Sequence, residues 1–105
     1  MREISPEELH ARLKAGDKPI VLDVREPWER QLCALPDSLH APMQQVPALM
    51  ETFDPEKEMV IYCHTGVRSA HVAQFLERNG FKNVANLKGG IEAWARTVDP
   101  TMARY

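Results

Sequence analysis

Short apolar runs alternate along this chain with stretches in which apolar residues recur every three or four positions. The runs 19–24 and 59–62 are rich in β-branched residues, which is typical of strands buried on both faces, and 81–87 predicts a third strand. Apolar stripes over 46–53, 72–76 and 91–98 predict helices that each pack one face inward. The pattern therefore predicts regular elements over most of the chain.

The first helix has the clearest boundary signals. Ser5 is a suitable N-cap, Pro6 suits the first helical position, and Glu8 completes a capping box. Gly16 supplies the left-handed position that commonly closes a helix. We therefore expect a helix over 6–15.

Strands and helices alternate with short connections, which predicts an α/β fold: a mainly parallel central sheet flanked by helices on both faces. We expect residues 1–105 to form a single domain, with an irregular tail over 99–105. In such sheets ligands bind beyond the carboxyl ends of the strands. Three groups follow predicted strands and so reach this edge: Cys63, Asp23 with Arg25, and Gly89 with Gly90.

The composition is that of an ordinary folded protein, with 44% hydrophobic and 27% charged residues. A net charge of -2 gives no basic field, so we expect neither nucleic acid nor membrane as a partner. The segment 1–10 lacks the apolar core of a signal peptide, and no apolar run approaches the roughly 18 residues of a membrane helix, so we expect a cytoplasmic protein. Its two cysteines, Cys33 and Cys63, are expected to be free thiols.

Cys63 is the strongest candidate for chemistry. It lies between the strand at 59–62 and the apolar stripe at 72–76, which places its thiol at a helix amino terminus. Backbone N–H groups and the helix dipole favour an anion there, and a thiolate is such an anion. Gly66 permits a tight turn, Arg68 adds positive charge for sulfonate or phosphate oxygens, and Ser69 can cap the helix or donate into the loop. We expect Cys63 to be a nucleophile rather than a buried structural cysteine.

Three motifs carry a family resemblance. The runs L-D-V-R-E-P-W-E at 22–29, C-H-T-G-V-R-S at 63–69 and N-L-K-G-G-I-E-A-W at 86–94 resemble the rhodanese family, and the similarity extends over almost the whole chain. The resemblance implies a thiosulfate sulfurtransferase, which moves a sulfane sulfur from a donor such as thiosulfate to cyanide or a thiol through a persulfide on Cys63. It also implies a substrate-binding loop formed by His64, Thr65, Gly66, Val67, Arg68 and Ser69.

With this function we expect a small-molecule sulfur donor and acceptor, a protein persulfide as a second candidate donor, no cofactor, and a monomer or weak dimer. Asp23 and Arg25 resemble structural signatures of the family, and we expect this oppositely charged pair to brace loops. The sequence departs from the family at 33–37, where C-A-L-P-D replaces glycine, histidine, an aliphatic residue, proline and glycine. Asp37 tolerates a left-handed turn better than most residues, so we expect the turn to persist.

Two other functions share part of this pattern. Cysteine phosphatases also place a cysteine and an arginine around an anion at a helix start, but only four residues separate Cys63 from Arg68, one fewer than in those enzymes. A non-catalytic rhodanese-like binding module would have lost the nucleophile or the loop, and both are present.

The sequence leaves the roles of two further residues open. His64 could act as a base, bind anions or lie in solvent, and Cys33 could be a resolving thiol, although a lone cysteine is more often inert. No ligand spacing predicts a metal site.

Overall fold

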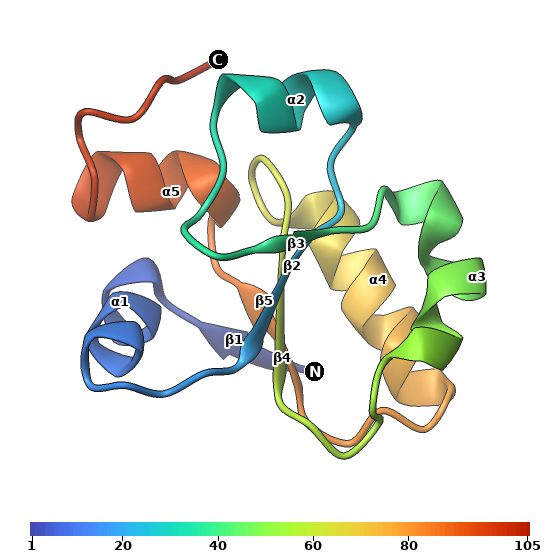
Figure 1. Cartoon of the computed structure of the whole chain (residues 1–105). Coiled ribbons are helices and arrows are strands. Elements are labelled where there is room, and N and C mark those ends of the chain that lie inside the picture. Colours follow the sequence, from blue (N-terminus) through green and yellow to red (C-terminus); the bar gives the residue numbers. More distant parts are fainter.

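The computed structural model describes all 105 residues and has a five-stranded sheet at its centre (Figure 1). The strands are β1 (Arg2–Ile4), β2 (Ile20–Asp23), β3 (Leu39–His40), β4 (Met59–Tyr62) and β5 (Val84–Leu87). The helices are α1 (Pro6–Lys14), α2 (Pro27–Leu32), α3 (Val46–Leu49), α4 (Val67–Arg78) and α5 (Gly90–Thr97). All neighbouring strands are parallel, in the order β1-β5-β4-β2-β3. The predicted α/β class is confirmed.

The two faces of the sheet are covered by different helices (Figure 1). One buried cluster joins β2 and β4 to α3 and α4, for example through Ile61, Val46 and Leu76. The other joins β1, β4 and β5 to α1 and α5, for example through Val60 and Trp94. Alternate residues of β4 thus enter opposite clusters, which is why this strand is apolar at every position. The predicted arrangement of helices on both faces is confirmed.

The first helix begins as predicted. The Ser5 hydroxyl accepts a hydrogen bond from the Glu8 N–H at 3.1 Å, and Pro6 occupies the first turn. The helix ends at Lys14, one residue earlier than expected, and Gly16 has the left-handed φ of 98° that closes it. Asp37 likewise has a left-handed φ of 57°, so the turn in the atypical 33–37 segment persists.

The helix predicted over 46–53 is correct only in its first turn, α3, because the chain continues as the 3₁₀ turn η2 (Met50–Thr52). Another 3₁₀ turn, η1 (Met43–Gln45), precedes α3. Pro47 lacks an N–H and so cannot continue the preceding turn, although it fits the start of α3. At the other end the Thr52 hydroxyl donates to the Leu49 carbonyl at 2.6 Å, and the Phe53 N–H bonds to Met50 instead. The apolar stripe itself still packs on the core.

Other boundaries also differ from the sequence prediction. The strand expected over 81–87 begins only at Val84, and the one expected over 19–24 covers Ile20–Asp23. The sequence pattern did not indicate β1, β3 or α2, which have three, two and six residues. No helix has both the length and the apolar composition needed to cross a bilayer.

Candidate functional site

Cys63 directly follows β4. Residues 63–69, which we call the Cys63 loop, lead into the first turn of α4. Its Sγ atom accepts hydrogen bonds from the Gly66 N–H at 3.1 Å and the Ser69 N–H at 3.4 Å. Gly66 makes this possible because its φ of 102° is left-handed and turns the backbone back toward the sulfur. Both N–H groups lie at the positive end of the α4 dipole, so the environment favours negative charge on sulfur.

The start of α5 holds the other side of this loop. The Ile91 N–H donates to the Cys63 carbonyl at 2.9 Å, and the Glu92 N–H donates to the His64 carbonyl at 3.0 Å. Gly90 lies so close that a Cβ atom on it would be 2.3 Å from the His64 carbonyl oxygen. The Cys63 and His64 carbonyls thus bond to α5. The Gly66 and Ser69 N–H groups, which come later in the loop, point to Sγ instead. The close approach to His64 explains why position 90 is glycine, whereas Gly89 has a left-handed φ of 76° and a Cβ atom on it would be 2.6 Å from that of Ala93.

Asn86 on β5 fixes the inner wall of the loop. Its Nδ2 donates to the Gly66 carbonyl at 3.1 Å and to Glu3 Oε2 at 2.8 Å, so its Oδ1 must face a donor. That donor is the Ser69 hydroxyl, at 2.5 Å. The same hydroxyl is 3.3 Å from Cys63 Sγ, but its one proton is used by Asn86. The donors to Cys63 Sγ are therefore the backbone N–H groups of Gly66 and Ser69 rather than the serine hydroxyl.

Arg68 lies at the far end of the loop and forms an ion pair with Glu29 of α2. Its Nη1 and Nη2 atoms donate to the two carboxylate oxygens at 2.8 and 2.9 Å. The Arg68 bonds lower the pKa of Glu29 to about 2, although burial opposes this shift. The sequence predicted Arg68 as positive charge and paired donors for a bound anion, whereas in the structure its guanidinium is paired with the Glu29 carboxylate. Further guanidinium N–H groups stay available for a ligand.

A second ion pair lies beneath the site. Arg25 and Asp23 are both fully buried. Arg25 donates from Nε to Asp23 Oδ1 at 2.9 Å and from Nη2 to Asp23 Oδ2 at 2.8 Å. Burial disfavours ionisation of Asp23, but the Arg25 bonds outweigh it and the pKa of the carboxyl lies below its ordinary value. Arg25 also donates to the carbonyls of Cys33 and Glu29 at 2.6 and 3.4 Å. The predicted role of this pair as a loop brace is confirmed.

The remaining predicted residues surround the loop. His64 is half-buried and its ring stacks on Tyr105, while Thr65 and Val67 are exposed. Cys33 Sγ lies 3.8 Å from Arg25 Nη1. The sequence reasoning missed Glu29, Asn86 and Tyr105. The first two fall within the motifs at 22–29 and 86–94, so the motifs themselves were the available signal.

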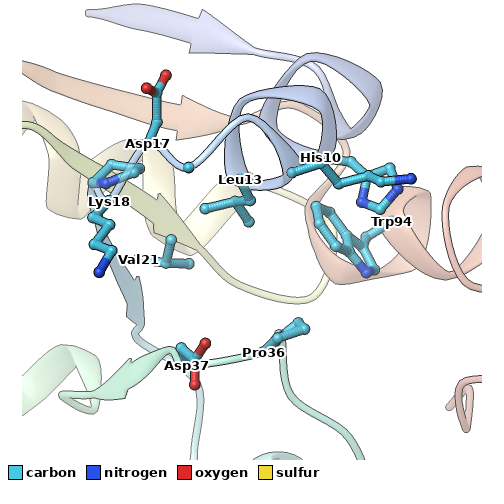
Figure 2. A pocket seen from close by; sticks show the side chains of 11 residues that line it. His10, Leu13, Asp17, Lys18, Val21, Pro36, Asp37 and Trp94 are labelled. Atoms are coloured by element: carbon cyan, nitrogen blue, oxygen red, sulfur yellow. The ribbon is translucent and has the colours of Figure 1, made fainter.

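A surface hollow lies elsewhere on the molecule. It has a volume of about 580 Å³ and lies between α1, the segment after it and the turn at Pro36 and Asp37 (Figure 2). Figure 2 shows His10 and Trp94 together on one side of it and Asp17 and Lys18 on the other. No residue of the Cys63 loop lines it. The Cys63 thiol therefore lies outside this hollow.

A family model described as "Rhodanese-like domain" matches residues 5–97. The chain belongs to the rhodanese-like family. A relative from Allochromatium vinosum named "Sulfurtransferase" is 37% identical, over 98% of this chain and 96% of its own length. "Putative sulfurtransferase YtwF" from Bacillus subtilis is also 37% identical, over 95% of this chain and 96% of its own.

The rhodanese-like fold is matched by solved structures and also occurs within longer proteins. The crystal structure of a rhodanese-like domain protein from Staphylococcus aureus superposes with a TM-score of 0.86 at 30% identity, covering 100% of this chain and 99% of that one. The chain spans only 38% of the Arabidopsis thaliana chloroplastic protein named "Rhodanese-like/PpiC domain-containing protein 12", to which it is 36% identical.

Proposed function

We propose that this rhodanese-like protein is a sulfurtransferase in which Cys63 carries the transferred sulfur as a persulfide. The observation that carries the proposal is the pair of N–H groups, from Gly66 and Ser69, that donate to Cys63 Sγ at the start of α4. Donors fixed in this way stabilise an anionic sulfur without reorganisation during the reaction. The relatives named sulfurtransferase support the same activity.

The proposed loading step begins with the Cys63 thiolate. Its sulfur attacks the outer sulfur of thiosulfate, forming a new S–S bond. The S–S bond of thiosulfate breaks, and its electron pair leaves with sulfite. In the discharge step cyanide or a thiolate attacks the outer sulfur of the persulfide, and the electron pair of that S–S bond returns to Cys63. Charge balances in both steps, and neither needs an external oxidant or a cofactor.

Arg68 has a narrower proposed role than its sequence position suggested. Two of its N–H groups are bonded to Glu29, so the remaining ones bind the oxygens of the departing sulfite. Because the ion pair is close to neutral, the backbone N–H groups provide most of the stabilisation of charge on sulfur. Cys63 is only 1% exposed, which favours slender donors, either thiosulfate or the persulfide side chain of another protein. We place the reaction in the cytoplasm, as the sequence predicted.

The test is a sulfur-transfer assay that measures thiocyanate formed from cyanide with several donors. We expect turnover with thiosulfate or with a protein persulfide, none in Cys63→Ser, and wild-type turnover in the matched variant Cys33→Ser. Wild-type turnover in Cys63→Ser would reject the proposed nucleophile. No turnover with any donor would instead support the alternative of a non-catalytic rhodanese-like module.

A further inference from the structure

The segment that follows α5 turns back over that helix and ends beside α2, at the same edge of the sheet as the Cys63 loop (Figure 1). Its last contact is made by Tyr105. The Tyr105 ring stacks on the ring of His64, with the centroids 4.0 Å apart and the planes 14° apart. His64 is the residue directly after the nucleophile. An irregular tail therefore contacts the first turn of the loop.

The Tyr105 hydroxyl reaches the other end of the loop indirectly. It donates to Glu29 Oε2 at 2.7 Å, and Glu29 in turn binds Arg68 through both carboxylate oxygens. The same hydroxyl accepts from Arg25 Nη1 at 3.0 Å. A single side chain thus connects the buried Asp23–Arg25 pair to the Glu29–Arg68 pair. Burial raises the pKa of Tyr105 above its ordinary value, against the opposing effect of Arg25, so its hydroxyl keeps the proton that it donates to Glu29.

The tail has further anchors that keep Tyr105 in place. Arg104 forms an ion pair with Glu92 of α5, and Trp28 contacts the Tyr105 ring edge-on at 5.7 Å between centroids. The tail packs against Cys33, His64 and α5, and the space between them is too small for a water molecule. These contacts hold Tyr105 against α2 and His64.

We propose that Tyr105 is a positioning residue for the sulfur-carrying loop. It holds His64 by stacking and holds Arg68 through Glu29, so both ends of the loop are fixed while the Gly66 and Ser69 N–H groups point at Cys63 Sγ. This inference rests on the proposed sulfurtransferase function. It assigns to the tail a part in the reaction that its irregular sequence gave no reason to expect.

Three variants test the proposal. Tyr105→Phe keeps the stacked ring and loses the hydroxyl bonds, Tyr105→Leu loses both, and Thr101→Ala is the control because Thr101 bonds only within the tail, to Asp99. Persulfide loading from thiosulfate is followed by intact mass at a temperature where circular dichroism shows every variant folded. We expect the maximal rate of loading to fall about threefold in Tyr105→Phe and at least about tenfold in Tyr105→Leu. The thiosulfate concentration that gives half of this rate should not change, and Thr101→Ala should load like wild type.

Amide resonances provide a readout that does not depend on activity. If Tyr105 positions the loop, the Gly66 and Ser69 amide protons, which donate to sulfur, shift in Tyr105→Leu, shift less in Tyr105→Phe, and keep their positions in Thr101→Ala. These shifts are expected even if wild-type protein loads from no donor, a result that would refute the proposed function alone. Unchanged amide shifts in Tyr105→Leu would overturn the positioning role. Faster loading in Tyr105→Leu would also overturn it, since it would show that the tail obstructs the site.

Discussion

Glu29 links α2 to the Cys63 loop, and replacing it with glutamine tests how much its charge contributes. The side chain is 3% exposed and accepts four hydrogen bonds, two from Arg68 and one each from Tyr105 and the Glu26 N–H. Glu29→Gln keeps the size but removes the charge, and its amide N–H₂ group faces donors rather than acceptors. The substitution therefore breaks the connection without creating a cavity.

The size of the effect follows from the pKa of Glu29, which these bonds lower from 4.5 to about 2. A difference of this size corresponds to about 3 kcal/mol of folding stability. Because the pKa is lowered in the folded state, the contribution is fully present above about pH 4.5 and is lost as the pH falls toward 2. The free energy of unfolding of wild type should therefore exceed that of Glu29→Gln by about 3 kcal/mol at pH 7, and the two values should converge near pH 2.

Urea denaturation at a series of pH values measures this difference directly. Glu51→Gln is the matched control, since Glu51 is exposed on η2, and it should differ from wild type by less than about 0.5 kcal/mol at every pH. A difference between wild type and Glu29→Gln that stays constant from pH 7 to about pH 2 would show that the charge of Glu29 is not what stabilises the site.

Three further predictions follow from the site. Gly90→Ala should lower the free energy of unfolding, measured by urea denaturation, by at least about 3 kcal/mol, because its Cβ would clash with the His64 carbonyl. Gly80→Ala is the control, since the space around Gly80 is open, and it should lower this free energy by about 1–2 kcal/mol. Arg68→Ala should slow persulfide loading about tenfold more than discharge to cyanide, since sulfite leaves only during loading; equal effects in stopped-flow traces would argue against this role. Aryl phosphates should not be hydrolysed above the rate of Cys63→Ser, and hydrolysis that this variant abolishes would favour the phosphatase alternative.

The sequence predicted those features that depend on local signals. The cap at Ser5, the strand at 59–62 and the placement of Cys63 at a helix start each follow from a few adjacent residues, and the structure confirms them. The helix predicted over 46–53 is α-helical only over Val46–Leu49, because an apolar stripe reports which face is buried and does not report where the backbone hydrogen bonds change to the 3₁₀ pattern. Strands as short as β1 and β3 have too few residues for any periodicity.

The partners of the site residues could not be predicted in the same way. The pairing of Arg68 with Glu29 joins residues 39 positions apart, and many acidic residues along the chain could have filled that role. The contact of Tyr105 with Glu29 spans 76 positions and involves a tail with no apolar pattern. Such pairings depend on how α2, α4 and the tail come together over the sheet edge, which is a property of the folded chain.

A persulfide on Cys63 is detected most directly by the intact mass of the protein after incubation with excess thiosulfate or a protein persulfide. We expect one added sulfur atom on wild type and on Cys33→Ser, its loss after cyanide treatment, and no addition to Cys63→Ser. Peptide mapping should place the added sulfur on Cys63. Sulfur found on Cys33, or no added mass with any donor, would refute a persulfide on Cys63.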